Sequence, residues 1–289
     1  MSKVGIVILN YNDSKTTINM INKIKDYKNI NHILIVDNNS SDDSVKNIYE
    51  VLDKKIEILE LKDNLGYAHG NNEGIKYLQD NYKLDYIIIS NPDINVKEST
   101  IGKMIDVLDE HKSVSLIAPY LDERGVISRG WKLPTYFDSL TTITNTKQRF
   151  HKKLGKYDDE HYKEELTEVD VVSGEFFMIR SDVIKDVDYF DEGTFLYYEE
   201  NILGTKLKKR DYKTYILTSE TAIHELSVSV DKSIKKIRKY KMLVKSLMYF
   251  EKKFKHTNIF GMMFLYIAYF FSLIGAYIVN IFKRWQNML

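Results

Sequence analysis

Asp85-Tyr-Ile-Ile-Ile-Ser-Asn-Pro-Asp93 is the stretch of sequence that determines the predicted fold. It begins with an acid and then places an aromatic residue before three β-branched ones, a pattern typical of a buried strand. Pro92 cannot donate a hydrogen bond to a sheet and disfavours helical geometry at Asn91, so the strand should end there. Asn91 and Asp93 are therefore predicted at the carboxyl end of a strand, where open α/β sheets bind ligands. A simple turn in which Asp93 caps the next helix is the alternative.

Strands and helices alternate on both sides of this stretch. Continuous apolar runs predict further strands over residues 4–9, 33–36, 55–61, 114–118 and 213–217. Helices should follow the first two strands, capped by Ser14 and by Ser41 or Asp42. This alternation predicts one α/β domain over residues 1–230, with a mostly parallel central sheet flanked by helices. Polar clusters follow three of the strands, so we expect one site along one edge of the sheet.

The composition excludes several classes of protein. The chain has 289 residues, of which 44% are hydrophobic and 29% charged, as in a globular protein with a sizeable core. It has no cysteine, which excludes disulfides and thiolate metal sites and suits a reducing cytoplasm. The motifs G-x-G-x-x-G and G-x-x-x-x-G-K-[ST] are both missing, which argues against dinucleotide oxidoreductases and P-loop NTPases.

Charge is unevenly distributed along the chain. The net charge is +1, but residues 231–255 hold ten Lys and Arg against two acids, whereas residues 1–230 are acidic overall. A basic segment of this kind indicates a membrane or a nucleic acid as partner. The 24 uncharged residues of 259–282 favour the membrane, because they suffice to cross a hydrocarbon core of roughly 30 Å. We expect a basic amphipathic helix over 231–256, a membrane-attachment segment over 257–289, and no nucleic acid partner.

The uncharged segment leaves alternatives open: a spanning helix, an interfacial hairpin or a buried core helix. Bases are more numerous before the segment than after it, which places the body of the protein on the cytoplasmic side of a cell membrane. The basic helix would then lie on anionic lipid.

Six motifs in a fixed order make the chain resemble glycosyltransferase family 2, whose members have the GT-A fold. They are V-x-I-V-I-L-N-Y-N from Val4, V-D-N-N-S-x-D from Val36, N-x-G-x-x-x-G-N-N-x-G from Asn64, N-P-D from Asn91, F-D-E-x-x-F-L-Y-Y-E-E from Phe190, and His224. Over residues 3 to about 255 the chain is similar to bacterial rhamnosyltransferase-like transferases of capsule, O-antigen and cell-wall assembly. The resemblance implies a nucleotide-binding half near 1–120 and an acceptor half near 121–230.

The resemblance also assigns residues that bind the nucleotide sugar. Asp37 matches the acid that reads the base or the ribose, although an ordinary strand-end turn is the alternative. Glycines 66, 70 and 74 would let the backbone approach the donor, although loop and helix packing would also explain them. The full set of expected nucleotide-sugar contacts is Asn10, Tyr11, Asn12, Asp37, Asn38, Asn64, Gly66, Gly70, Asn71, Asn91 and Asp93.

A divalent metal, Mn²⁺ or Mg²⁺, is the cofactor that the resemblance implies. Asp93 matches the last acid of the family's metal motif, and hard cations prefer oxygen ligands. The usual D-x-D is here Asn91-Pro-Asp93, so the first ligand is weaker or absent. His224 matches the metal-binding histidine of many relatives.

Glu199-Glu200 matches the family's E-D pair, whose second acid deprotonates the acceptor hydroxyl. Glu200 is therefore the expected base and Glu199 a hydrogen-bonding neighbour. Ile202 stands where the family has a further acid, which leaves open which glutamate reaches the acceptor. Helix N-terminal acids that complement the helix dipole are the alternative. Expected contacts to acceptor or donor sugar are Arg129, Trp131, Gly174, Glu175 and Tyr197.

These assignments predict a membrane-attached inverting glycosyltransferase, with a homodimer left open. It would move one sugar from a UDP- or dTDP-sugar to a lipid-linked saccharide. A processive synthase is excluded because Ile281 replaces the glutamine of Q-x-x-R-W. A sugar nucleotidyltransferase lacks support because Asn10-Tyr-Asn-Asp is not its glycine-rich, basic loop. A catalytically inactive, nucleotide-sugar-binding membrane scaffold stays open because of the Glu-Glu pair.

Overall fold

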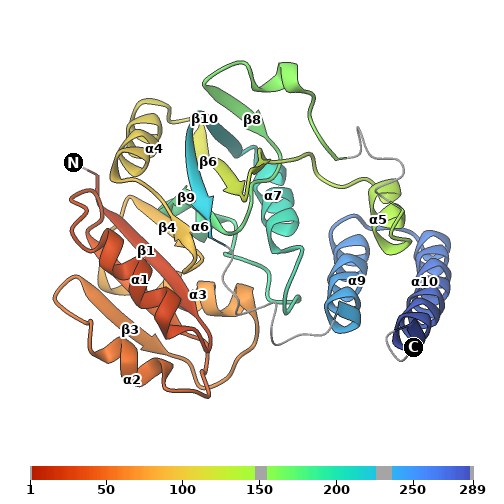
Figure 1. Ribbon diagram of the computed structural model, residues 1–289. Coiled ribbons are helices and arrows are strands. Elements are labelled where there is room, and N and C mark those ends of the chain that lie inside the picture. Colours follow the sequence, from red (N-terminus) through yellow and green to blue (C-terminus); the bar gives the residue numbers. More distant parts are fainter. Residues whose placement is uncertain (1, 147–154, 226–235, 287–289) are drawn as a thin grey trace.

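The first four strands form the parallel half of a central sheet. The computed structural model describes residues 2–146, 155–225 and 236–286. β1 (Val4–Asn10), β2 (His32–Asp37), β3 (Ile56–Glu60) and β4 (Tyr86–Ser90) lie in the order β3-β2-β1-β4, all parallel (Figure 1). Every residue of β4 is buried, as its apolar sequence predicts. The predicted strand at Asp85-Tyr-Ile-Ile-Ile-Ser is thus confirmed next to β1.

The second half of the sheet is mixed. β9 (Phe176–Arg180) runs antiparallel between β4 and β6 (Val114–Glu123), and β6 pairs in parallel with β10 (Lys213–His224). Three short strands complete the sheet: β5 (Ile94–Asn95), β7 (Val126–Ser128) and β8 (Leu166–Val169). The expected parallel order therefore holds from β3 to β4 and changes at β9.

β10 extends seven residues beyond the predicted strand, which was placed at 213–217. Polar residues interrupt its apolar pattern after Leu217, where the register with β6 shifts. Pairing of β10 with β6 resumes at Thr221. The last residues of β10 also pair with β5, so that His224 lies opposite Ile94. β6 is also longer than predicted and ends at Glu123. Both extensions bring a polar side chain to the same edge of the sheet.

Helices cover both faces of the sheet. α1 (Ser14–Ile24), α2 (Ser44–Tyr49) and α4 (Glu98–Glu110) pack on one face, and α3 (Tyr67–Asn81), α6 (Ser181–Asp186) and α7 (Glu199–Lys209) on the other (Figure 1). Successive strand residues alternate between the two cores, with Ile6 and Ile8 in one and Val7 in the other. The predicted helix caps were wrong: α1 is capped by Asp13, whose carboxylate accepts from the Thr16 amide, and α2 begins only after Asp43.

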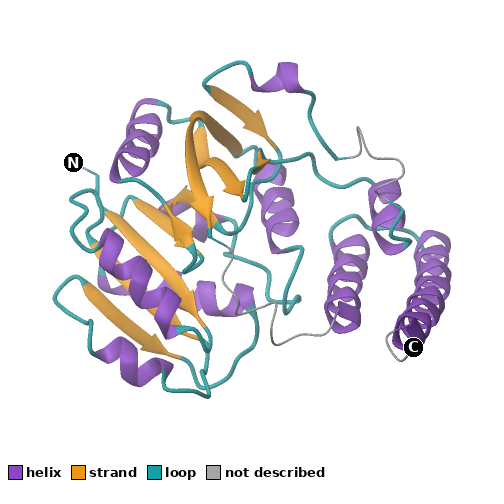
Figure 2. Cartoon of the chain, viewed as in Figure 1, coloured by secondary structure: helices purple, strands orange, loops and turns teal. Residues whose placement is uncertain are grey.

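Three helices form a separate core beside the sheet (Figure 2). They are α5 (Tyr136–Ile143), α9 (Lys236–Lys253) and α10 (Ile259–Gln286). α9 lies within the helix predicted over 231–256 and ends at Lys253, three residues before the predicted end; residues 231–235 lie outside those described. A single-turn helix, η1 (Asp159–Tyr162), precedes β8.

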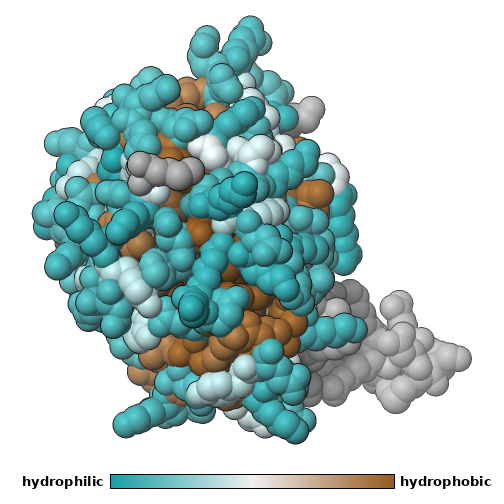
Figure 3. Space-filling view, turned by 90° about the vertical axis from the view of Figure 1, so that its left-hand side faces the viewer, coloured by the Kyte–Doolittle hydropathy of each residue, from teal (hydrophilic) through white to brown (hydrophobic). Residues whose placement is uncertain are grey.

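α10 is long and apolar enough, from Ile259 to Ile278, to cross a membrane, and most of its side chains are exposed. Its inner face, with Met262 and Leu265, packs into the third core. A soluble core helix would be mostly buried, so the predicted alternative of a buried helix is wrong for this segment. The surface on the opposite side of the molecule, by contrast, is largely hydrophilic, with one hydrophobic area low on that face (Figure 3).

Candidate active site

The carboxyl ends of β1 and β2 carry a buried polar network. Asn10 and Asp37 are register partners, and the Asn10 amide donates to Asp37 Oδ2 at 2.7 Å. The other Asp37 oxygen accepts from the Ser40 amide at 2.8 Å, and Asp37 is only 1% exposed. This network fixes the loop that presents the exposed ring of Tyr11 and the backbone of Asn12. The expected roles of Asn10 and Asp37 in nucleotide binding stay predictions, since their polar groups already have partners in the protein.

Asn38, Asn64 and Asn71 lie at the start of α3. The side-chain amide of Asn38 donates to Asn64 Oδ1 at 3.0 Å, and the side-chain amide of Asn71 donates to the backbone carbonyl of Tyr67 at 3.0 Å. The Oδ1 atoms of Asn38 and Asn71 are buried and accept no hydrogen bond. A buried acceptor without a donor is costly, so both oxygens are free to accept from a bound ligand.

The glycines of this segment are explained by contacts within the protein. Gly66 has φ +109°, and a Cβ there would lie 2.3 Å from the carbonyl oxygen of Phe195. A Cβ on Gly70 would lie 2.4 Å from Leu9 Cδ1, so Gly70 lets α3 approach β1. Packing, the alternative considered from the sequence, therefore accounts for both positions, and their contact with a donor stays a prediction.

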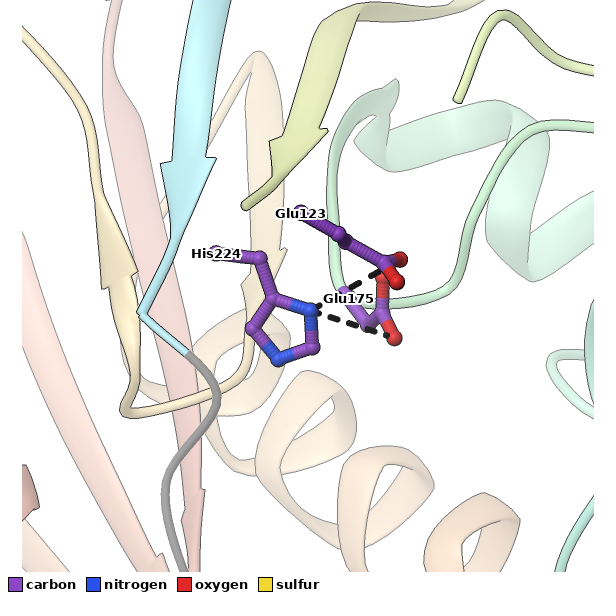
Figure 4. Close-up of side chains that lie close together, drawn as sticks. All are labelled: Glu123, Glu175 and His224. Atoms are coloured by element: carbon purple, nitrogen blue, oxygen red, sulfur yellow. Dashed lines mark ion pairs between the residues drawn. The ribbon is translucent and has the colours of Figure 1, made fainter. Parts of the chain in front are cut away.

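Asp93 and His224 meet at the edge of the sheet, as the resemblance implied. Asp93 is 8% exposed and His224 7% exposed, and His224 Nε2 lies 3.1 Å from Asp93 Oδ2. The other ring nitrogen, Nδ1, lies 3.6 Å from Glu175 Oε1 and 3.7 Å from Glu123 Oε1 (Figure 4). Two residues of this group, Glu123 and Glu175, were not predicted there.

The donor set of this group suits a hard divalent cation. Glu123, Glu175 and His224 each offer a ligand atom, and these atoms lie within 4.8 Å of one another. His224 Nδ1 is buried and makes no hydrogen bond, and it faces the two carboxylates (Figure 4). Carboxylates are the protein ligands that suit Mn²⁺ and Mg²⁺, and a neutral imidazole can add a nitrogen ligand to a divalent transition metal. The residues therefore fit the implied metal.

The charges of the group affect one another. Burial opposes a positive charge on His224, but Asp93, Glu175 and Glu123 outweigh it and raise the His224 pKa. Burial disfavours the ionised carboxylate of Glu175 and raises its pKa. The Ser173 hydroxyl, which donates a hydrogen bond to this carboxylate at 2.7 Å, lowers the pKa in part. The backbone N–H of Asn91 donates to the backbone carbonyl of Glu175 at 2.8 Å, which ties the N-P-D turn to this residue. Glu175, expected among the sugar contacts, is thus one of the candidate metal ligands.

Glu123 could have been found only indirectly from sequence. It lies in Asp122-Glu-Arg-Gly125, which predicts a hairpin turn, and the structure confirms that turn between β6 and β7. The sequence places no strand up to Glu123, because the apolar run stops at Ala118. Only the pairing of β6 with β10 carries Glu123 to the edge where His224 lies.

Glu199 and Glu200 begin α7. Tyr197 and Tyr198 precede them in the left-handed region, with φ of 76° and 74°. Glu199 is 3% exposed and its Oε1 makes no hydrogen bond. Burial, with the neighbouring charge of Glu200, raises the Glu199 pKa to about 8. Burial also raises the pKa of Glu200.

Gly174 makes room for Glu200. A Cβ on Gly174 would lie 2.7 Å from Glu200 Oε1 and 2.9 Å from Glu200 Cγ, so the two residues are in close contact. Tyr67 donates its hydroxyl to the Gly174 carbonyl at 2.6 Å, which holds this turn against α3. The structure thus places Gly174 beside the expected base.

Of the remaining predicted contacts, Trp131 lies near the glutamates. Its indole donates to Asn201 Oδ1 at 2.9 Å, one residue after Glu200. Arg129 forms an ion pair with Asp159 at 2.6 Å and stacks over Tyr120 and Tyr162. Its expected sugar contact stays a prediction.

Glu175 joins the two groups into one site. Its carboxylate is near enough to His224 and to Glu200 to shift the pKa of both. A candidate metal group and the Glu199-Glu200 pair therefore lie at one edge of an open α/β sheet.

This architecture is the GT-A fold of the glycosyltransferases. The family model "Glycosyl transferase family 2" matches residues 5–188, and the chain belongs to this family.

Two curated proteins and several solved structures are similar to the chain. Hexosyltransferase Agl10 of low-salt glycan biosynthesis in Haloferax volcanii is 25% identical, over 69% of this chain and 60% of that protein. Rhamnosyltransferase WbbL of Escherichia coli K12 is 27% identical, over 55% of this chain and 60% of that protein. The chain thus matches about three fifths of the length of each.

Among solved structures, GalNAc-T7 with UDP, GalNAc and Mn²⁺ has a TM-score of 0.58 at 10% identity, over 78% of this chain and 44% of that one. S. aureus TarS 1-349 has a TM-score of 0.55 at 14% identity, over 88% of this chain and 73% of that one. These two likenesses, at such low identity, concern the fold alone.

Proposed function

We propose that the protein is an inverting, metal-dependent glycosyltransferase. It transfers one sugar from a nucleotide-diphosphate sugar, a UDP- or dTDP-sugar, to a lipid-linked or polysaccharide acceptor of bacterial surface polysaccharide synthesis. Family membership supports the reaction class, and the named activities of Agl10 and WbbL support hexosyl or deoxyhexosyl transfer. TarS in complex with UDP-GlcNAc supports a nucleotide-sugar donor.

The observation that carries the proposal is that Glu175, one of the candidate metal ligands, also lies near Glu200. Transfer to a hydroxyl needs a base at the acceptor and a positive charge at the leaving diphosphate, close to each other. His224, Glu175 and Glu123 would hold the metal, with Asp93 at the other ring nitrogen of His224. When bound, the metal would offset the negative charge that develops on the diphosphate.

Glu200 would act as the base. Its carboxylate takes the proton of the acceptor hydroxyl while the new C–O bond forms and the bond to the diphosphate oxygen breaks. A single displacement of this kind inverts the anomeric carbon. Burial raises the pKa of Glu200, which brings a carboxylate closer to the range where a general base is efficient.

Membrane attachment at the cytoplasmic side is part of the proposal. α9 carries many bases, and α10 exposes Phe260, Phe264, Phe270 and Phe271 along its length. Basic amphipathic helices bind anionic lipid, and an exposed apolar helix is stabilised by the hydrocarbon core. A lipid-linked acceptor would reach a site held close to the bilayer.

Glu200→Gln tests the reaction. Glutamine keeps the shape and the hydrogen bonds but removes the basic site, so transfer should fall by roughly 10²-fold or more. The donor is first found by a thermal-shift screen of nucleotide sugars, because a bound ligand stabilises the native state. Donor affinity of the variant, measured by calorimetry, should stay unchanged. A near wild-type rate for Glu200→Gln together with a slow Glu199→Gln would reverse the assignment of the base.

A nucleotide-sugar-binding scaffold is the second candidate function. Ile202, where the family has a further acid, is fully buried in the third core, so no acid supplements Glu199 and Glu200 at that turn. Wild-type protein that binds a nucleotide sugar but neither transfers nor hydrolyses it would favour the scaffold.

A further inference from the structure

The backbone just before the glutamates is in an unfavourable conformation. Tyr197 and Tyr198 both have positive φ, and neither is glycine. Large residues rarely adopt this region, and such conformations persist only where the surroundings hold them. Tyr198, in the left-handed conformation, is the N-cap of α7, so its backbone conformation sets the positions of Glu199 and Glu200 in the first turn of the helix. The contacts of this turn therefore position the candidate base.

The turn packs on the third core, while α3 holds the loop before it through the Tyr67 backbone N–H, which donates to the Phe195 carbonyl at 3.0 Å. The Tyr198 ring is 8% exposed and lies 5.4 Å from the Phe250 ring of α9. Burial raises the pKa of the Tyr198 hydroxyl, and Ser139 of α5 lies close enough to lower it in part. Ser139 itself donates to Glu251 of α9 at 2.6 Å. Ser139 and Glu251 are both fully buried. A buried hydrogen bond between Ser139 and Glu251 thus joins α5 to α9 beside the turn.

α9 also contacts the loop before the turn. Ser246, 4% exposed, donates to the carbonyl of Leu196 at 2.8 Å. Tyr249 donates its hydroxyl to Asp191 at 2.7 Å, and Lys253 pairs with the other Asp191 oxygen at 2.8 Å. Gly193 lies directly against the Tyr249 ring, with no room for a side chain. Residues 191–198, here called the acidic loop, are therefore fixed to α9 at both ends.

We propose that Ser246 and Tyr249 of α9 are positioning residues for the glutamate pair. Without these contacts the acidic loop would relax toward ordinary backbone angles, and Glu200 would move away from Gly174. The C-terminal helices are then part of the machinery that sets the turnover rate, in addition to attaching the protein. This inference rests on the proposed function for its kinetic readout, but the positioning itself is measurable without turnover.

The test uses three single variants of the full-length chain in detergent. Ser246→Ala and Tyr249→Phe each remove one hydrogen bond to the acidic loop, and neither residue touches the proposed reacting atoms. Lys245→Ala is the matched control, since its side chain is exposed on the same helix. Turnover, donor KM and hydrogen exchange of residues 190–200 are measured for all three.

We expect kcat to fall by roughly tenfold in Ser246→Ala and Tyr249→Phe, because misplacement by about 1 Å can cost on the order of 10²-fold. Donor KM should stay unchanged, amides of residues 190–200 should exchange faster, and those of β1, β2 and β4 should not. Lys245→Ala should match wild type. Unchanged kcat and exchange in both variants would overturn the inference, as would faster exchange across the whole sheet.

Failure of the proposed function has a different signature. If wild-type protein transfers no sugar from any nucleotide sugar tested, the exchange data alone decide. Faster exchange confined to residues 190–200 then supports positioning of the loop by α9, and unchanged exchange there contradicts it.

Discussion

Glu199 and Glu200 are adjacent in the chain but have different surroundings. Glu199 is buried with an unpartnered oxygen, whereas the carboxylate of Glu200 lies against Gly174. Successive side chains on a helix point about 100° apart, so the two carboxylates serve different positions. This geometry agrees with Glu200 as the expected base, and the sequence resemblance had reached the same pair.

The pKa of Glu199 predicts how stability changes with pH. In the folded protein the Glu199 pKa is about 8, whereas its ordinary value, which applies to the unfolded chain, is 4.5. Its favourable contribution to folding is complete below about pH 4.5 and is lost as the pH rises to 8. In this window the unfolding free energy should fall by up to about 1.4 kcal/mol per pH unit.

Glu199→Gln removes this titration. We expect the variant to be more stable than wild type at pH 8 and to have a flatter profile between pH 5 and 8. Urea unfolding of both proteins at several pH values measures the difference. Parallel profiles for wild type and variant would show that Glu199 is ionised in the folded protein at neutral pH.

Metal dependence is predicted from the group around His224. Turnover should need Mn²⁺ or Mg²⁺. Asp93→Ala should weaken Mn²⁺ binding by roughly tenfold or more, since partners of metal ligands typically contribute 10–100-fold, and Glu123→Gln should also weaken it because it removes a candidate ligand. Calorimetric titration with Mn²⁺ measures this without turnover, and Glu110→Gln, an exposed acid on α4, is the control. Full activity in excess chelator would make Asp93 an ordinary turn residue.

The sequence predicted the metal group only in part. Asp93 and His224 were paired across 131 residues by resemblance, and the structure brings them to 3.1 Å. Glu123 was missed and Glu175 was assigned to the sugar, because their positions depend on strand register. Register in β6 and β10 follows from pairing between distant strands, which a local apolar pattern does not encode.

At the scale of elements, the strands of the parallel half were predicted, whereas in the mixed half the strands over 114–118 and 213–217 were predicted but not their C-terminal extensions or the antiparallel pairing of β9. β1, β2 and β4 are buried on both faces and therefore appear as continuous apolar runs. β10 is polar after Leu217 and continues only because β6 and β5 supply its hydrogen bonds. The apolar pattern therefore did not predict the end of β10, which carries His224.

Two helical glycines give opposite predictions. Gly70→Ala should destabilise the protein by about 1–3 kcal/mol, because its Cβ would overlap Leu9 where α3 approaches β1. Gly102→Ala, inside α4, should stabilise it by about 0.5–1 kcal/mol, because its Cβ meets only Asn29 at 3.6 Å and alanine favours the helix. Thermal unfolding of both variants checks the pair. Equal effects of the two substitutions would refute the packing explanation of Gly70.

At the scale of the whole molecule, the third core joins the C-terminal helices to the α/β domain. Tyr198 and Ile202 of the α7 segment pack with Val244, Leu247 and Phe250 of α9. The sequence predicted α9 as a basic amphipathic helix lying on anionic lipid, and it did not predict what covers the apolar face. That face is largely buried against the acidic loop and α5, because both present apolar residues that need covering.

The C-terminal segment supplies the last prediction. α10 packs its Met262 and Leu265 face on α5 and α9 and exposes apolar side chains on its other faces, so a bilayer is the surrounding that would stabilise it. Full-length protein should need detergent. Deleting residues 257–289 should release the protein from membranes only in part, since α9 keeps its exposed bases.

High salt should then strip the truncated protein from vesicles of anionic lipid, because charges exposed to solvent are screened within about 3 Å at 1 M salt. Full-length protein should stay bound at the same salt concentration, since apolar burial is not weakened by screening. Flotation of both proteins with anionic and neutral vesicles, at low and high salt, separates the two contributions. Full-length protein that is soluble without detergent, or that salt removes as readily as the truncated form, would leave α9 as the membrane contact and α10 as a surface for another protein.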